Sequence, residues 1–336
     1  MRIAGALSLA AAAGLSALVF FANAGSEASN DAMDVAAYPI THFKIGSDET
    51  RFGPFEFVGG LELTSRNRNF GSLSAFRFLK SGEDFIGVAD AGFWAFGRVV
   101  RDDGGRPVGF ADFHLEAMLG RTGNATDEKW DVDAEGLAVK EGIATVGFER
   151  DHRIAQFRID PEGMGPAFRE LNYLVPSWEL RRNKGFETVA YSPSASPHHG
   201  GLVVITERSI DKEGNIFAAI IEGPNKGVFT VKRNADFDIT DGAFLPDGDL
   251  LLLERKFSMA SGVAMRLRRI DGETLAKGRI ADGPVLLEAD MGYQIDNMEG
   301  LDVWQREDGA TMVSIVSDDN NSILQRNLYL EFRLVE

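Results

Sequence analysis

Short apolar runs alternate with turn-forming residues along most of the chain, and hardly any segment keeps a helical period. Four turn sequences, each between two such runs, are "DDGG" at 102–105, "DKEGN" at 211–215, "PDGD" at 246–249 and "EDGA" at 307–310. Each predicts a hairpin, because glycine and aspartate supply the backbone conformations and side-chain hydrogen bonds of tight turns. The pattern therefore predicts an all-β fold of meandering strands.

The apolar runs also repeat at a long period. Five of them, "SAFRFL", "EGLAV", "ETVAY", "DGAFL" and "EGLDVW", begin at Ser74, Glu135, Glu187, Asp241 and Glu299. The intervals of 61, 52, 54 and 58 residues exceed a hairpin and fit four-stranded propeller blades. We predict a β-propeller of five blades, with a sixth, degenerate blade inside 92–130 or 256–298 as the alternative.

The two ends of the folded chain are predicted to complete one blade together. Strand-like runs occupy 40–46 and 55–65 near the N-terminus and 328–336 at the C-terminus. Joining them in one sheet closes the ring and protects strand edges that would otherwise be exposed. Residues 39–336 are therefore expected to form a single propeller domain.

Each repeat has a second run that ends in a polar cluster. The acids of these clusters are Asp90, Glu149, Glu207, Glu254 and Asp318, and the arginines that follow three of them are Arg150, Arg208 and Arg255. In a blade, the start of the first strand and the end of the second lie at the same face of the disc. Both polar registers are therefore expected to meet at one mouth of the central channel.

Carboxylates gathered at one opening repel one another and need a compensating charge. The available ligand atoms are oxygens and the chain has no cysteine, so Ca²⁺ is the preferred cofactor and Mg²⁺ the second choice. The predicted metal ligands are Asp90, Glu135, Glu149, Glu187, Glu207, Asp241, Glu254, Glu299 and Asp318. In the alternative interpretation, these acids satisfy turn amides or form surface salt bridges with the arginines.

Charge and the N-terminal segment restrict the partners and the location. The formal net charge of -16 disfavours a nucleic acid or an anionic membrane as a partner. Residues 1–24 have a basic start, an apolar run and small residues before an expected cleavage after Ala24. We predict a signal peptide over 1–24, with a membrane anchor as the alternative, and a flexible lead-in over 25–38. The mature protein is expected to be a periplasmic or secreted monomer without a membrane anchor.

Several short motifs, in order, resemble the phytase-like family of exported bacterial proteins, whose domain is described as esterase-like. They are "GSLSAFRF", "DAEGLAV", "GFETVAYSP", "DGAFLPDGDLLLLERKF" and "NMEGLDVW", and the resemblance runs from about residue 41 to the C-terminus. It implies a β-propeller related in style to calcium-dependent phytases, and hydrolysis of phosphate or other esters. The chain has Ser72-Leu73-Ser74 where the family commonly has Gly-Leu-Ser, so the role of Ser74 stays open.

The registers and the resemblance together predict a calcium-dependent hydrolase of small anionic esters. The predicted catalytic residues are Glu135, Glu187, Asp241 and Glu299. The predicted substrate-binding residues are Arg150, Arg208, Arg255, Lys256 and His152. Three arginines favour an anionic substrate. Two alternatives remain, a calcium-dependent lactonase of the gluconolactonase type and a non-catalytic periplasmic scaffold with structural ions.

Overall fold

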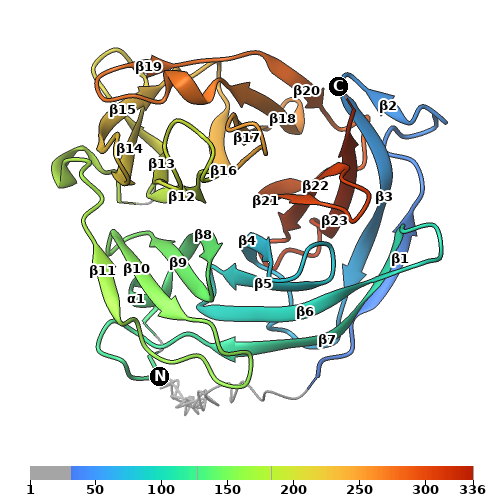
Figure 1. Ribbon diagram of the computed structural model, residues 1–336. Helices are drawn as coiled ribbons and strands as arrows, with labels where there is room; N and C mark the ends of the chain where they lie inside the picture. The colour runs from blue at the N-terminus through green and yellow to red at the C-terminus, as the bar shows by residue number, and fades with distance from the viewer. Residues whose placement is uncertain (1–31, 127, 183, 336) are drawn as a thin grey trace, which may run out of the picture.

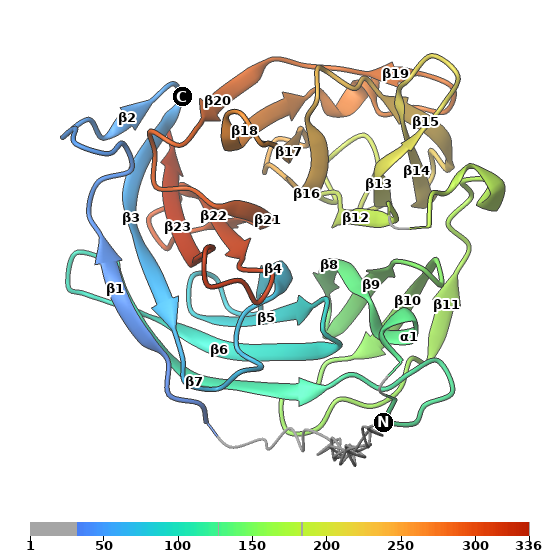
Figure 2. The same cartoon turned by 180° about the vertical axis from the view of Figure 1, so that it is seen from behind.

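Five sheets stand in a ring around a common centre, with one strand of each sheet innermost (Figures 1 and 2). This computed structural model describes residues 32–126, 128–182 and 184–335, so the predicted signal peptide, 1–24, lies outside the described residues. In the described part, helix is confined to α1 (Lys129–Val132) and two 3-10 turns, Ser177–Glu179 and Gly272–Thr274. None of these has the length or apolar composition of a membrane span. The described chain confirms the all-β propeller and its five blades.

Four blades follow one another in chain order. The first consists of β4 (Leu73–Phe78), β5 (Asp84–Ala89), β6 (Phe93–Arg101) and β7 (Pro107–Ala117). The second consists of β8 (Ala134–Lys140), β9 (Ile143–Phe148), β10 (Arg153–Arg158) and β11 (Arg169–Leu171). The third consists of β12 (Phe186–Tyr191), β13 (Leu202–Ile210), β14 (Ile216–Glu222), β15 (Gly227–Val231) and β19 (Ile280–Ala281). The fourth consists of β16 (Asp238–Phe244), β17 (Leu250–Ser258), β18 (Gly262–Ile270) and β20 (Val285–Ala289).

The fifth blade joins the N-terminal and C-terminal strands of the folded chain, as predicted for 55–65 and 328–336. The predicted strand over 40–46 is wrong, because the outer strand ends at Ile40 and Lys44 forms only an isolated bridge with Tyr293. From the axis outward its strands are β21 (Asn297–Gln305), β22 (Thr311–Asp318), β23 (Asn327–Leu334), β3 (Phe55–Thr64) and β1 (Ala36–Ile40), and β2 (Arg51–Phe52) pairs with β3. The antiparallel pairing of β3 with β23 closes the ring. The segments considered for a sixth blade, 92–130 and 256–298, instead supply outer strands of the first, third and fourth blades.

The predicted turns connect neighbouring strands of one sheet. Segments 102–105, 211–215, 246–249 and 307–310 join β6 to β7, β13 to β14, β16 to β17 and β21 to β22. Aspartate caps the turns, because the Asp102 carboxylate accepts hydrogen bonds from the N–H groups of Gly104 and Arg106 at 2.9 Å each. The same side-chain contact recurs at Asp211. These turns determine which strands pair, and hence where each blade begins at the axis.

Aromatic side chains fill the space between neighbouring blades. Trp94 of β6 meets Phe157 of β10 with ring centroids 5.0 Å apart, which joins the first blade to the second. Phe43, which follows β1, packs edge-on against Phe332 of β23 at 5.0 Å, in a buried cluster that also contains Leu251 and Leu253 of the fourth blade. A fully buried phenylalanine contributes about 1.5–3 kcal/mol through burial. The chain has 24 phenylalanines, and those between blades help to hold the inner strands in place.

Residues before the expected boundary at Pro39 already take part in the fold. Strand β1 starts at Ala36, and the N–H of Met33 donates to the carbonyl oxygen of Phe113 at 2.6 Å. Met33 and Val35 also pack against the buried residues of the first and fifth blades. The second half of the predicted flexible lead-in, 25–38, is therefore part of the folded domain.

Candidate functional site

All five inner strands carry a β-bulge close to their first residues. The pairing of each inner strand with its neighbour shifts by one residue at Ser74, Glu135, Glu187, Thr240 and Glu299. A bulge leaves one residue unpaired in the ladder, bends the strand and re-aims the side chain. The polar residues that open the inner strands are therefore bulge residues at one end of the channel, and four of these five positions are those predicted from the repeat.

The second strands have a matching polar position at the same end. Ala134 pairs with Phe148 just before the bulge of the second blade, and the next residue of the second strand is Glu149. In the fourth blade Ile239 pairs with Glu254 just before the bulge. The next residue, Arg255, is therefore the equivalent of Glu149. The same rule across all five blades gives Asp90, Glu149, Glu207, Arg255 and Asp318.

These two sets of residues surround a cavity of about 140 Å³, called here the acidic cavity. It is lined by Ser74, Asp90, Glu135, Glu149, Lys184, Glu187, Glu207, Arg255, Glu299, Asp318 and Asn320. The structure thus brings together seven of the nine acids proposed as metal ligands, with Arg255 among the five proposed substrate-binding residues. Ser74, whose role the sequence left open, also lines the cavity.

Asp241 does not line the acidic cavity, although it was predicted as a catalytic residue and metal ligand. Its carboxylate is fully buried and accepts hydrogen bonds from both terminal nitrogens of Arg77 at 2.7 Å. It also accepts the N–H of Leu301 at 2.7 Å. The bulge of the fourth blade lies at Thr240, one residue earlier, and a one-residue offset turns a strand side chain to the other face. These contacts indicate that Asp241 stabilises the fold and does not bind a metal in the acidic cavity.

Glu254 is displaced from the cavity by the same offset. It was predicted as a metal ligand, but its side chain forms ion pairs with Arg266 and Arg268 of β18. All three side chains are buried within the fourth blade. Glu254 therefore neutralises a pair of buried arginines, while its neighbour Arg255 reaches the cavity.

Two of the three predicted substrate arginines are engaged elsewhere. The Nε of Arg150 lies 2.5 Å from Oδ2 of Asp133, and Arg208 lies 3.3 Å from the carboxylate of Asp238. Neither lines the acidic cavity. Of the three arginines predicted to bind substrate, Arg255 is therefore the one that lines the acidic cavity.

Lys256 and His152 also stay outside the cavity lining. The ammonium of Lys256 lies 4.7 Å from the ring centroid of Phe237. Nε2 of His152 lies 3.0 Å from the carbonyl oxygen of Arg181, and burial lowers the pKa of His152. Both predicted substrate-binding residues thus contact other parts of the protein.

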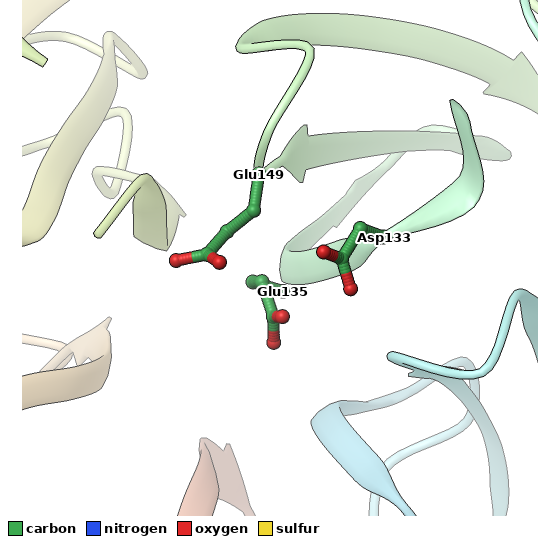
Figure 3. Close-up of side chains that lie close together, drawn as sticks. All are labelled: Asp133, Glu135 and Glu149. Carbon is green, nitrogen blue, oxygen red and sulfur yellow. The ribbon is translucent and has the colours of Figure 1, made fainter. Parts of the chain in front are cut away.

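Two overlapping groups of carboxylates are close enough to share a cation. One comprises Glu149, Glu187 and Glu207, and the other comprises Asp133, Glu135 and Glu149; within each group one oxygen from every residue lies within 4.8 Å of the others. Figure 3 shows the second group, with Glu149 leaving the end of β9 beside Glu135 of β8. An all-oxygen, all-carboxylate donor set suits a hard divalent cation such as Ca²⁺.

Burial and mutual repulsion raise the pKa values of the acids that line the cavity. Burial raises the pKa of Glu149 to about 7 and the pKa of Asp318 to about 8. Burial, and after it the nearby charge of Glu149, raises the pKa of Glu135 well above its usual value. The pKa of Glu187 is raised well above its usual value by burial and then by Glu135. A bound cation would relieve this repulsion, so the residues present fit a metal.

Arg255 supplies a cation at the side of the cavity formed by the fourth blade. Its guanidinium lies 3.0 Å from a carboxylate oxygen of Glu299 and 3.9 Å from one of Glu207. Burial alone would lower the pKa of Arg255, but these carboxylates and that of Glu187 raise it above its ordinary value. Arg255 is therefore charged at any physiological pH.

Two further residues belong to this site and were not predicted from the sequence. Lys184 lines the cavity with its Nζ 2.6 Å from Oε2 of Glu207. Asp133 completes the second carboxylate group, and burial raises its pKa. Asp133 lies two residues before Glu135, a spacing that places both side chains on one face of an extended chain and could have indicated it. Lys184 lies in the irregular segment 176–185, where no repeat pattern marks it.

Comparison with solved structures finds distant relatives in fold. The chain is similar to endo-arabinase from Bacteroides thetaiotaomicron, with 11% identity, coverage of 80% of this chain and 95% of that chain, and a TM-score of 0.47. It is also similar to glutaminyl cyclase from Myxococcus xanthus, with 14% identity, coverage of 84% and 97%, and a TM-score of 0.45. These scores are too low to support an argument about activity. The curated protein sequences contain no match to the chain.

The family comparison is more informative. The model of the phytase-like family, described as "Esterase-like activity of phytase", matches residues 68–321. This match covers all five inner strands, and with them every predicted acid of the two registers. The protein therefore belongs to the phytase-like family.

Proposed function

We propose that the protein is a calcium-dependent hydrolase that acts on phosphate or other anionic esters at the acidic cavity. The observation that carries this proposal is the packing of carboxylates from two neighbouring blades, Glu149, Glu187 and Glu207, within 4.8 Å of one another. Carboxylates at this separation with strongly raised pKa values are typical of a functional site or of an ion site. Membership of the phytase-like family supports hydrolysis.

In this proposal the second and third blades hold the cation. Glu135, Glu149, Glu187 and Glu207 provide the carboxylate oxygens, and Ca²⁺ is preferred to Mg²⁺ because it tolerates many protein oxygens in a flexible arrangement. When bound, the metal supplies positive charge that polarises an ester oxygen and lowers the pKa of a bound water. Binding of the metal also removes the repulsion that raises the pKa of the acids.

The residues of the fourth blade and the loop before β12 would bind the substrate. Arg255 presents a permanently charged guanidinium at the cavity edge, where it can donate hydrogen bonds to an anionic ester oxygen. Lys184 can do the same as a point charge, since it lines the same cavity. The cavity of about 140 Å³ admits the ester group of a substrate but little more, so the rest of the substrate would lie outside it.

One observation favours a second candidate, a lactonase or an esterase for uncharged esters. Arg255 and Lys184 are both already paired with carboxylates, at 3.0 Å and 2.6 Å. An uncharged ester would not need either cation and could use the metal alone. A non-catalytic scaffold would hold the same ion without turnover.

A substrate panel separates these candidates. The purified protein is incubated with a phosphomonoester, a phosphodiester, a carboxylic ester and a lactone, each with Ca²⁺ and with chelator. The proposal expects calcium-dependent turnover of an anionic ester above the others. Turnover of the lactone alone would favour the lactonase, and absence of turnover with calcium still bound would favour the scaffold.

We propose further that the protein works outside the cytoplasm as a monomer. The leader-like segment 1–24 supports export. Free Ca²⁺ is more abundant outside cells than in the cytosol, where a site of modest affinity would stay empty. Light scattering of the mature chain and fractionation of producing cells test both points.

A further inference from the structure

A second and larger cavity lies at the opposite end of the inner strands. It has a volume of about 570 Å³ and is called here the distal cavity. Residues at or near the last positions of the inner strands line it, among them Phe78, Val139, Tyr191, Phe244 and Trp304. The acidic cavity is formed by the first residues of the same strands, so the two cavities open at opposite faces of the propeller. Cavities of this size accommodate small organic ligands.

The floor of the distal cavity separates it from the acidic cavity. Arg77 lines the distal cavity, and its guanidinium is held by both oxygens of Asp241 at 2.7 Å. It also donates to the carbonyl oxygens of Phe76 and Leu301, at 2.7 and 2.6 Å. These contacts engage both terminal nitrogens of the guanidinium and fix it between the inner strands. Arg77 is therefore a neutralised part of the floor.

Asp302 is the acid that faces this cavity. The residue is buried, with 8% of its surface exposed, and Oδ2 accepts the N–H of Phe78 at 2.8 Å. The charge of Asp302 is only partly offset, because Arg77 lowers the pKa of Asp302 but makes its ion pair with Asp241. Among the described residues that line the distal cavity, Arg77 and Asp302 are the charged ones.

The walls of the distal cavity are largely aromatic and aliphatic. The rings of Phe78 and Tyr191 are partly exposed to it, while Phe244 and Trp304 are more deeply buried. The faces of aromatic rings attract cations, and a lone carboxylate at the base of an apolar cavity favours a positively charged hydrogen-bond donor. The net negative charge of the protein adds to this preference.

We propose that the distal cavity binds a small organic cation, a protonated primary amine on an aromatic or short aliphatic body, with its ammonium group against Asp302. The apolar body lies between the rings of Phe78 and Tyr191. This ligand site is separate from the acidic cavity and does not depend on the function proposed for it. Binding at one face leaves the other face free.

Other charged groups near the walls do not reverse this preference. The ammonium of Lys140 lies 4.9 Å from the ring centroid of Tyr191 and donates to the carbonyl oxygen of Gly200. Arg101 lies over the Trp304 ring at 5.0 Å, and its charge is met by Glu331, whose two oxygens lie 2.8 Å from it. These cations lie outside the residues that line the cavity.

The proposal predicts a pH dependence for amine binding. Burial raises the pKa of Asp302 to about 6, against the lowering effect of Arg77. Protonated Asp302 has no charge to offer an ammonium group, so affinity should fall by up to about tenfold for each pH unit below 6. Against the lowering effect of burial, the nearby carboxylates raise the pKa values of Arg77 and Arg101 above their usual value, so both arginines remain charged throughout this range.

Calorimetric titration of the full mature protein with 2-phenylethylamine tests the proposal, and phenylacetate of similar size serves as the anionic comparison. The amine should bind at pH 7.5 and phenylacetate should bind at least tenfold more weakly. Asp302→Asn keeps the hydrogen-bond acceptor but removes the charge, and should weaken amine binding about tenfold or more. Ser81→Trp, at an exposed position of the cavity lining, should block it.

The matched control is Glu187→Gln in the acidic cavity, which should leave amine binding unchanged. Equal binding of the amine and phenylacetate would overturn the proposal. So would absence of amine binding at millimolar concentration, or unchanged binding in both Asp302→Asn and Ser81→Trp. Should Asp302→Asn fail to fold, Ser81→Trp and the pH series decide the outcome by themselves.

Discussion

Arg255 stands where the other four blades place an acid. Its position in the second strand matches those of Asp90, Glu149, Glu207 and Asp318. The acidic cavity is therefore asymmetric, with the closest carboxylate groups at the second and third blades and a guanidinium at the fourth. This division allows one side to hold a cation and the other to hold an anionic substrate.

The first prediction compares Arg255 with Arg208. Arg255→Ala should lower kcat/KM for an anionic ester by about tenfold to a thousandfold, because a charge-assisted contact to the substrate is lost. Arg208→Ala should leave kcat/KM unchanged, since Arg208 pairs with Asp238 outside the cavity. Steady-state kinetics of both variants test this. Equal losses of kcat/KM in the two variants would contradict this. They would show that the one-residue shift of the bulge in the fourth blade does not determine which arginine binds substrate.

The second prediction concerns Asp241, which we assign to structure. Asp241→Asn should lower the free energy of unfolding by about 3–5 kcal/mol, because it leaves the buried Arg77 without its carboxylate. Calcium affinity of the folded variant should not change. Asp308→Asn, which breaks an exposed pair with Arg306, is the matched control and should hardly alter stability. Chemical denaturation and calcium titration measure both quantities, and a loss of calcium affinity in Asp241→Asn would contradict the assignment.

The third prediction follows from the raised pKa values of Glu149 and Asp318, about 7 and about 8. An acid whose pKa is higher in the folded state favours folding below its unfolded pKa, near 4, and loses that contribution as pH rises through its folded pKa. The chelated protein should therefore lose stability between about pH 4 and pH 8. Calcium should restore it, because a bound cation favours the charged carboxylates.

Melting curves at pH 5.5 and pH 8, with and without Ca²⁺, check this. The rise in Tm on adding calcium should be larger at pH 8. An equal rise at both pH values, or no rise, would show that these acids do not bind the cation.

At the residue scale the sequence predicts most of the site but misplaces the fourth blade. Asp241-Gly242 looks like Glu135-Gly136 and Glu299-Gly300, so an alignment of repeats equates them. The bulge at Thr240 breaks this equivalence by one residue, and only the strand pairing reveals it. Lys184 could not be predicted either, because its position depends on how an irregular segment returns to the cavity.

At the element scale, the turns and the long-period repeat predict different features. The four Asp- and Gly-containing turns correctly predict which runs form hairpins, and the repeat predicts the five inner strands. Strand β19 could not be predicted, since it has two residues and crosses from the fourth blade to pair in parallel with β15 of the third. Such a short pairing depends on the neighbouring blade being in place.

The fourth prediction tests ring closure. Removal of residues through Thr64 deletes β1, β2 and β3 and exposes the edge of β23, so the chain should lose cooperative folding or aggregate. A chain that starts at Thr41 is the control: it lacks only the outermost strand β1 and should keep a cooperative transition at lower Tm. Gel filtration and thermal melting distinguish them. A monomeric, cooperatively folded chain without β3 would show that closure does not require it.

At the scale of the whole molecule, the propeller has two chemically different ends. The start of the inner strands holds the acidic cavity, and their far end holds the distal cavity with its aromatic walls. The ion pair of Arg77 and Asp241 lies between them among the inner strands. The net charge of -16 favours cations near both openings, so an anionic substrate would depend on a bound metal and Arg255.

The central claim is that carboxylates of the second and third blades hold a calcium ion needed for ester hydrolysis. The most direct test measures turnover of the best anionic ester from the substrate panel after chelation and again after stepwise addition of Ca²⁺. The wild-type protein should lose activity on chelation and regain it as calcium binds. The double variant Glu149→Gln, Glu187→Gln should bind calcium weakly and stay inactive at the same concentrations. Full turnover in chelator, or wild-type turnover by the double variant, would contradict the account.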